Sequence, residues 1–334
     1  MQIVLKKKRN NCKEINISLF DNCNLRCKFC FQFNNTYNNS KNLSIDERVN
    51  LALNYADTHK KEYSHYIFII MGGELFADFN SDELFSKYQE IVDRIHNKYP
   101  TSPISFVSNM VFTKIKRVKN FCEKNKDILK VAVSFDFYGR FHNNIILNRY
   151  MDNIKLFKNY ISGFAFNMIK PSLDIVMGKI KDDIGVMQCY NYIYDNFKTC
   201  YDYYAPDEYM RKEYTPTYSD LYNFFKYMIK HYPKTEPFNS WLNNKENTLT
   251  CMRTTYITNN GIVERCREFA TKESNCFNTT GNNDEMENKF LKKYNCLSCK
   301  YYSRCTMGCF MYFDYKDSKD YDDCIYKRIF EELE

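Results

Sequence analysis

The sequence predicts an α/β protein built on a parallel sheet, followed by a smaller cysteine-rich region. Over the first two-thirds of the chain, short apolar runs typical of strands alternate with segments whose apolar residues recur at helical spacing. This alternation favours a parallel sheet with crossover helices. After Trp241 the regular periods fade, and eight of the 15 cysteines fall between Cys251 and Cys324. We therefore expect one domain over residues 1–238 and a second over residues 239–334.

Six strand–helix units are expected in the first domain. The strands are predicted at residues 15–19, 66–70, 104–107, 131–135, 164–168 and 198–204. The helices are predicted after Ser44, where Glu47 completes a capping box, after Ser81, and around 115–121, 154–157, 172–197 and 221–229. Six units are too many for a small sheet and too few for the eight-unit barrel.

Composition limits the class of protein. The chain has 334 residues, of which 44% are hydrophobic and 27% charged, as in a soluble globular protein. It has no apolar run of membrane-spanning length, and its N-terminus lacks the apolar core of a secretory signal. We therefore expect a cytoplasmic protein, in which many cysteines indicate metal or redox chemistry rather than disulfides. The net charge of +7 is spread along the chain, so neither nucleic acid nor a membrane is an expected partner.

The first cysteine cluster follows the first predicted strand. Cys23, Cys27 and Cys30 have the spacing C-x3-C-x2-C, in a loop at the strand's carboxyl end, where α/β proteins bind ligands. Three thiolates can hold a cubane iron–sulfur cluster and leave its fourth iron open to a substrate or cofactor. Spacing alone leaves open a zinc site with a distant fourth ligand.

The second predicted strand ends in Met71-Gly72-Gly73-Glu74. Two glycines at a strand end let the backbone approach a ligand, and the carboxylate that follows can receive an ammonium group. Alone, this segment usually indicates a turn. One strand after the cysteine loop, it favours a site for an amine-bearing cofactor.

These residues resemble those of the radical S-adenosylmethionine (SAM) enzymes, over about residues 14–235. The resemblance implies a (β/α)6 partial TIM barrel, in agreement with the six units. It implies that the three cysteines hold a [4Fe-4S] cluster whose open iron chelates SAM. Reductive cleavage of SAM then gives a 5′-deoxyadenosyl radical that abstracts a hydrogen atom. The family motif has proline where Leu75 stands here, a modest departure.

The resemblance also implies residues that contact SAM. Gly72, Gly73 and Glu74 would contact the methionine amino group, and Phe29 would lie near the adenine. Ser108-Asn109 match a polar pair near the cofactor. Ser134, Asp136 and Arg149 resemble a Ser-x-Asp-Gly…His…Arg stretch, with Gly139 and His142 in looser register. There the serine faces the ribose and the arginine pairs with the carboxylate. As ordinary structural residues, Ser134 would be a polar core residue and Arg149 a solvated helix start.

The C-terminal cysteines form a second pattern. Cys251-x9-Gly261-x4-Cys266 surrounds a predicted hairpin over residues 256–265 that turns at Asn260-Gly261. The run Cys296-x2-Cys299-x5-Cys305-x3-Cys309 follows, and then Cys324. With Cys276 the count reaches eight, so two zinc ions remain an alternative. The whole spacing resembles the SPASM extension of radical SAM enzymes, which carries two auxiliary [4Fe-4S] clusters.

The SPASM resemblance implies a ligand set for each auxiliary cluster. Cluster I would be held by Cys251, Cys266 and Cys309, and cluster II by Cys296, Cys299, Cys305 and Cys324. Cluster I then lacks a fourth ligand, so its iron is open or is reached by Cys189, Cys200 or Cys276. Cys189 and Cys200 are also candidate hydrogen-atom donors, and no other catalytic residue is identified.

The resemblance implies an oxidoreductase that matures a peptide or protein. RiPP-type crosslinking, epimerisation or oxidation would be the modification, with a flavodoxin- or ferredoxin-type protein as electron donor. The 22 residues before Cys23 leave no room for an N-terminal peptide-recognition domain, so a separate leader-peptide-binding protein is an expected partner. A dehydrogenase or epimerase of a small metabolite such as a carbohydrate is the alternative. A third hypothesis is a non-enzymatic iron–sulfur or zinc protein. The Gly-Gly-Glu segment disfavours it, because such a protein needs no site for a cofactor amine.

The two resemblances together imply that the ten patterned cysteines hold three [4Fe-4S] clusters, and hence about twelve irons per chain after anaerobic reconstitution. Iron, sulfide and zinc analysis of the reconstituted protein checks this number. A plateau near four irons, with zinc making up the rest, would contradict the two auxiliary clusters.

Overall fold

The computed structural model describes residues 12–30, 43–203, 212–245, 254–263, 283–305 and 323–334. These form one eight-stranded sheet with the order β6-β5-β4-β3-β2-β1-β7-β8. The strands are β1 (Cys12–Ser18), β2 (His65–Met71), β3 (Ile104–Ser108), β4 (Leu129–Phe135), β5 (Ile161–Met168), β6 (Thr199–Tyr203), β7 (Thr254–Thr258) and β8 (Gly261–Val263). The pairs between β1 and β6 are all parallel.

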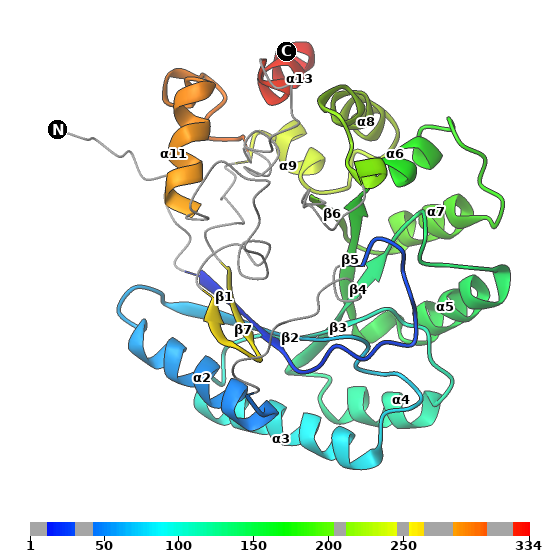
Figure 1. Cartoon of the computed structure of the whole chain (residues 1–334), viewed down its shortest axis with the longest axis vertical. Helices are drawn as coiled ribbons and strands as arrows, with labels where there is room; N and C mark the ends of the chain where they lie inside the picture. The colour runs from blue at the N-terminus through cyan, green and yellow to red at the C-terminus, as the bar shows by residue number, and fades with distance from the viewer. Residues whose placement is uncertain (1–11, 31–42, 204–211, 246–253, 264–282, 306–322) are drawn as a thin grey trace.

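The six predicted strand–helix units are present, and they curve into a partial barrel. Figure 1 shows the main helices on the convex side of the sheet, with strands β1 to β6 following one another around the arc. The main helices are α2 (Ile45–Thr58), α3 (Asp82–Lys98), α4 (Ile115–Lys124), α5 (Asn144–Leu156), α6 (Lys170–Val176), α7 (Val186–Asn196) and α8 (Tyr218–His231). The expected (β/α)6 partial TIM barrel is confirmed.

Alternation along the strands separates the two faces of the sheet. In β2, Tyr66, Phe68 and Ile70 are buried, whereas Ile67 and Ile69 are partly exposed. Because successive side chains of a strand point to opposite faces, the buried set packs under the helices and the other set faces the concave side. Partly exposed strand side chains at other positions, such as Ser134 and Asn167, belong to this concave face.

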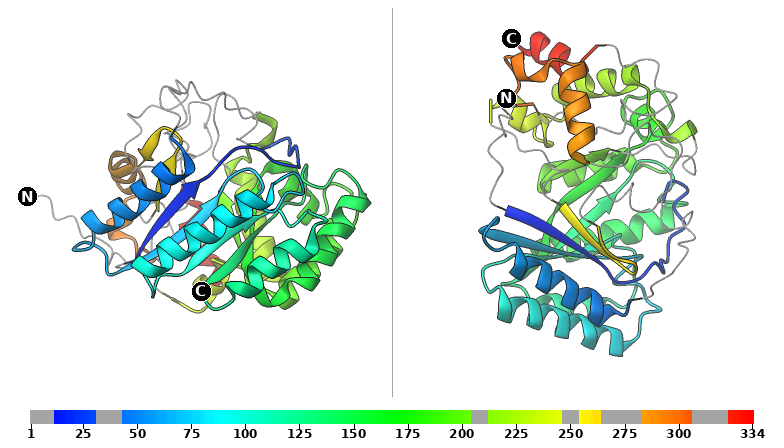
Figure 2. Two further views of the ribbon diagram at one scale, coloured as in Figure 1. Left: turned by 90° about the horizontal axis from the view of Figure 1, so that it is seen from below. Right: turned by 60° about the vertical axis from the view of Figure 1, so that its left-hand side comes forward.

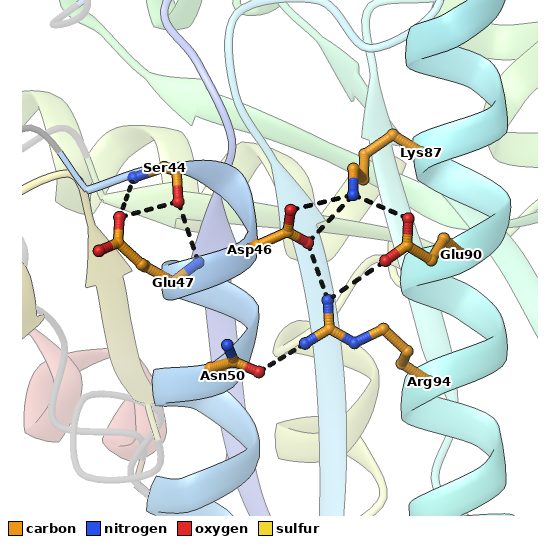
Figure 3. Close-up of polar contacts among 7 residues, drawn as sticks. All are labelled: Ser44, Asp46, Glu47, Asn50, Lys87, Glu90 and Arg94. Carbon is orange, nitrogen blue, oxygen red and sulfur yellow. Dashed lines mark hydrogen bonds and ion pairs between the residues drawn. The ribbon is translucent and has the colours of Figure 1, made fainter.

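Helices α2 and α3 are joined by the charged contacts drawn in Figure 3. The predicted capping box is present, because Glu47 N–H donates to Ser44 Oγ and Ser44 N–H donates to the Glu47 carboxylate at 2.7 Å. Asp46 of α2 accepts from Lys87 at 3.0 Å and from Arg94 of α3 at 2.9 Å. These groups are partly solvated, so each ion pair contributes at most about 1 kcal/mol to stability.

Two local expectations need correction. The predicted 172–197 helix is broken into α6 and α7, since Gly178 and Gly185 adopt φ values of +70° and +79° that end one helix and precede the next. The hairpin turns one residue earlier than predicted. Thr258 pairs with Gly261, so Asn259 and Asn260 form the two-residue turn and Gly261 begins β8.

The C-terminal region is attached to the barrel at two places. Strand β7 pairs in parallel with β1, from Glu14 opposite Thr254 to Ile17 opposite Ile257, and so extends the first domain's sheet. Figure 2 shows this strand, in yellow, alongside β1. Besides β7 and β8, the region contains α11 (Asn283–Lys293) and α13 (Ile325–Leu333). The domain boundary near residue 240 stays a prediction.

Helix α13 provides the second attachment, at the far end of the sheet. Its buried Phe330 lies 5.3 Å from Trp241 of α9 (Phe238–Leu242), measured between ring centroids. The Tyr326 hydroxyl is hydrogen-bonded to the Tyr203 hydroxyl at the end of β6, at 2.5 Å. In the part of the chain that the structure describes, no helix is long and apolar enough to cross a membrane.

Candidate active site

The predicted cysteine loop lies at the carboxyl end of β1. Buried Leu25 and Phe29 anchor the loop, and between them Cys27 is also buried. Cys23 and Cys30 remain partly exposed. The apolar side chains of the loop turn inward, and the loop lies at the edge of the sheet where the parallel strands end.

Gly72 and Gly73 pack against the backbone of this loop. Gly73 N–H donates to the Phe20 carbonyl at 2.7 Å, and Glu74 N–H donates to the Asn22 carbonyl at 2.9 Å. A Cβ atom at Gly73 would lie 1.9 Å from the Asn22 oxygen, and one at Gly72 would lie 2.7 Å from the Phe20 oxygen. The two glycines are therefore required by close contact between two backbone segments.

Glu74 is buried and ties β2 to β3. One carboxylate oxygen accepts from Phe76 N–H at 2.9 Å and from the Ser108 hydroxyl at 2.7 Å, and the other accepts from Asn109 N–H at 2.6 Å. Burial raises the pKa of Glu74, while these hydrogen bonds and the charge of Arg140 oppose the increase. The carboxylate thus has several partners within the protein, and its predicted bond to the methionine ammonium would be an additional one.

Asn109 connects β3 to the cysteine loop. Its side-chain N–H group donates to Asn24 Oδ1 at 2.8 Å and to Cys23 Sγ at 3.7 Å, and its side-chain oxygen Oδ1 accepts from Val111 N–H at 2.8 Å. The predicted pair Ser108-Asn109 is therefore brought together with Glu74 and Cys23 in one hydrogen-bonded group.

The three thiols suit an iron–sulfur cluster. None forms a disulfide, and Cys23 Sγ accepts from Leu25 N–H at 3.4 Å as well as from Asn109. Burial raises the pKa of Cys23 to about 11 and that of Cys27 to about 12. Metal binding would replace these protons. Among the described residues no three Cys, His, Asp or Glu side chains converge on a single ion. A cubane does not need such convergence, because each thiolate binds a different iron.

Sequence reasoning missed Arg140. It lies in the loop between β4 and α5, is buried, and pairs with Asp136 at 2.6 Å. Its guanidinium carbon is 5.9 Å from the centroid of the Phe29 ring. The sequence signal for it is a basic residue four positions after Asp136. The Ser-x-Asp-Gly…His…Arg stretch instead has its arginine later in the chain, at Arg149.

Two other predicted residues, Arg149 and Cys189, lie on helices rather than at strand ends. Arg149 is exposed on α5, as expected of an ordinary solvated helix residue, so its placement does not support pairing with the cofactor. Cys189 is buried in α7, where its thiol contacts Met151 of α5 on the helical side of the sheet. That placement does not support its role as a hydrogen-atom donor or cluster ligand. Ser134 and Cys200 are partly exposed on β4 and β6.

The described C-terminal cysteines are Cys296, Cys299, Cys305 and Cys324. Cys296 and Cys305 are buried, and Cys299 N–H donates to the Cys296 carbonyl at 3.0 Å. Burial raises the pKa of Cys324, and the nearby Cys299 adds to the increase. The proposed ligands of auxiliary cluster I, Cys251, Cys266 and Cys309, and also Cys276, lie outside the described residues.

Comparison with protein families assigns the class. The model of the radical SAM superfamily matches residues 17–203, which span the cysteine loop, the Gly-Gly-Glu segment and strands β2 to β6. The chain therefore belongs to the radical SAM superfamily. It is an enzyme of the class that uses SAM and a [4Fe-4S] cluster for radical chemistry.

Two solved structures of a protein called anSMEcpe share the fold over nearly the whole chain. The structure with bound AdoMet and the Cp18Cys peptide has a TM-score of 0.60 and 18% identity, and covers 96% of this chain and 95% of that one. The structure with bound AdoMet alone has a TM-score of 0.61, with the same identity and coverage. No curated protein sequence matches the chain.

Replacing Gly73 with alanine should displace the cysteine loop, because the new Cβ would lie 1.9 Å from the Asn22 oxygen. We expect a loss of about four irons per chain, measured after anaerobic reconstitution. Gly178→Ala is the control: nothing lies within 4 Å of its Cβ, so it should cost only about 1–2 kcal/mol of backbone strain and keep the iron. Full iron content in Gly73→Ala would show that the contact is dispensable.

Proposed function

We propose that this protein is a radical SAM enzyme with a SPASM extension that abstracts a hydrogen atom from a peptide or protein substrate. The observation that carries the proposal is the joining of Cys23, Gly73, Glu74 and Asn109 in one group of close contacts at the carboxyl ends of β1, β2 and β3. This is the arrangement that a cluster-bound, amine-bearing cofactor needs, with thiols beside a tightly packed backbone and buried hydrogen-bonding groups.

The proposed roles follow from these contacts. Cys23, Cys27 and Cys30 would hold the [4Fe-4S] cluster, which supplies the electron that cleaves SAM. Glu74 would receive the methionine ammonium, and its internal hydrogen bonds hold the carboxylate in one orientation for that contact. Buried Phe29 would provide an apolar surface for the adenine.

The concave face carries polar side chains that could recognise a substrate. Ser134 of β4, Asn167 of β5 and Asp202 of β6 are at least partly exposed there. Although the Asp202 side chain is exposed, the protein around it limits the hydration of its carboxylate and raises its pKa to about 6, and the charges of Asp136 and Glu14 add to the increase. A carboxyl group that titrates near neutral pH is suited to proton transfer with a bound substrate.

The peptide substrate is supported by the C-terminal cysteine spacing and by the fold shared with a structure that contains a bound peptide. The modification of the peptide would be a crosslink, an epimerised centre or an oxidised side chain. The proposal also includes two auxiliary [4Fe-4S] clusters, a flavodoxin- or ferredoxin-type electron donor, a separate leader-peptide-binding protein and a cytoplasmic location.

The triple replacement of Cys23, Cys27 and Cys30 by alanine should abolish formation of 5′-deoxyadenosine from SAM under dithionite, because no thiolate remains to hold the cluster. It should also abolish any mass change in a peptide encoded beside the gene. Both products are measured by liquid chromatography and mass spectrometry, with Cys122→Ala, at a buried cysteine of α4, as the control.

Continued 5′-deoxyadenosine formation by the triple variant would contradict the radical assignment. A wild-type enzyme that forms 5′-deoxyadenosine only with a sugar or another small metabolite would instead favour the metabolite enzyme.

Glu74→Ala should weaken SAM binding more than it lowers iron content. A charge-assisted hydrogen bond contributes about 1.5–3 kcal/mol, or about a 10- to 150-fold change in affinity. The variant also leaves three buried donors without their acceptor, so its free energy of unfolding should fall by about 1–3 kcal/mol. Anaerobic calorimetry of SAM binding and denaturant unfolding measure the two effects.

The exposed Glu83, in the first turn of α3, provides the control: Glu83→Ala should leave SAM affinity unchanged and lower the free energy of unfolding by only about 0.3–1 kcal/mol. If Glu74→Ala kept both the full iron content and the wild-type SAM affinity, Glu74 would not be a SAM-binding residue.

A further inference from the structure

A buried ion pair lies beside the cysteine loop, in residues to which the cluster motif assigns no role. Asp136 is fully buried, and Arg140 is 8% exposed. One oxygen of Asp136 accepts from Nε of Arg140 at 2.7 Å and lies 2.6 Å from its Nη2. The other oxygen accepts from the backbone and side-chain N–H groups of Asn167 at 3.0 and 3.1 Å. Four short contacts therefore fix the carboxylate and, through it, the guanidinium.

The loop between β4 and α5, which carries Asp136 and Arg140, packs on the ring of Phe29. Phe29 stands between Cys27 and Cys30 in the chain, and the Arg140 guanidinium carbon is 5.9 Å from its ring centroid. Gly139 adopts φ +75°, and a Cβ atom there would lie 3.3 Å from Cδ1 of Phe29. The loop between β4 and α5 thus contacts Phe29 through both a backbone segment and a buried cation.

Arg140 is placed to act on the charge of this site. Its guanidinium is buried and lies 5.9 Å from the ring centroid of Phe29, which stands between Cys27 and Cys30 in the chain, so little water screens its charge from the cysteine loop. Arg26 and Lys28 belong to the cysteine loop itself but are exposed, so water and salt screen their charges.

We propose that Arg140 is a positioning residue of the cluster site, which holds Phe29 against the cysteine loop and makes reduction of the cluster more favourable. This inference rests on the proposed function, because it requires a cluster on Cys23, Cys27 and Cys30. The step is the transfer of one electron from an external donor to the cluster, which gains one negative charge. A buried, fixed cation stabilises that added charge, and the internal hydrogen bonds of Asp136 keep the cation in place.

Two substitutions should move the reduction potential in opposite directions. Arg140→Gln removes the cation and should lower the equilibrium constant for reduction of the cluster at least tenfold. This corresponds to a reduction potential lower by about 59 mV for one electron. Asp136→Asn removes the opposing charge and should raise the potential. The potential is measured by anaerobic redox titration of the reduced-cluster resonance signal that changes when SAM is added, with iron content determined on each sample.

Arg117 of α4 provides a matched control. Its guanidinium carbon is 4.2 Å from the Phe85 ring centroid, and it pairs with the exposed Asp82 at 3.3 Å, so it makes the same two kinds of contact with residues outside the cysteine loop. It also donates to the carbonyls of Ala77 and Asn80. Arg117→Gln should lower stability without moving the potential. Arg140→Lys keeps a cation but not the planar fork, so it should hold the potential closer to that of the wild type than Arg140→Gln does.

The outcomes separate the inference from the proposed function. If Arg140→Gln and Asp136→Asn both keep the wild-type potential with full iron content, the inference is wrong. If Arg140→Gln fails to hold a cluster, the potentials of Asp136→Asn and Arg140→Lys test the inference instead. An unchanged potential in Asp136→Asn then overturns the inference. A wild-type protein that forms no SAM-responsive cluster would instead overturn the proposed function.

Discussion

The close approach of two backbone segments is the constraint on which the rest of the site depends. The end of β2 and the loop after β1 touch through three main-chain hydrogen bonds, at Met71, Gly73 and Glu74. Side chains at Gly72 and Gly73 would occupy the space of carbonyl oxygens at Phe20 and Asn22. Parallel pairing of β1 with β2, from Cys12 opposite His65 onward, brings these two segments to the same level.

Buried polar groups then transmit this placement to the neighbouring strands. Glu74 binds the end of β3 through Ser108 and Asn109, and Asp136 binds β5 through Asn167. A buried carboxylate is costly unless its oxygens are paired, so each of these residues fixes its partners in one arrangement. The site is therefore held from β1 to β5 by groups that tolerate little displacement.

The cysteine-rich region depends on the barrel for its attachment. Strand β7 joins the sheet beside β1, while α13 packs on α8 and on Trp241, and Tyr326 bonds to the end of β6. The two attachments lie at opposite ends of the six-stranded array, since β1 and β6 are its outer members. The described part of this region is thus continuous with the fold that carries the first cysteine cluster.

The sequence by itself determined the features that depend on local pattern. Periodicity gave the six strand–helix units, the capping residues Ser44 and Ser81 marked helix starts, and the spacing of Cys23, Cys27 and Cys30 indicated the cluster loop. Each of these signals lies within a few residues of the structure that it specifies, so it can be recognised without knowing what packs against it.

Only the tertiary structure decided which distant residues meet at the site. It placed Arg140 rather than Arg149 beside Phe29, put Cys189 on the helical side of the sheet, and paired β7 with β1. It also showed that Gly73 is needed against Asn22, about fifty residues earlier in the chain. These outcomes depend on strand register and on the direction of each side chain. A shift of one residue in the register of a strand turns its side chains to the opposite face of the sheet.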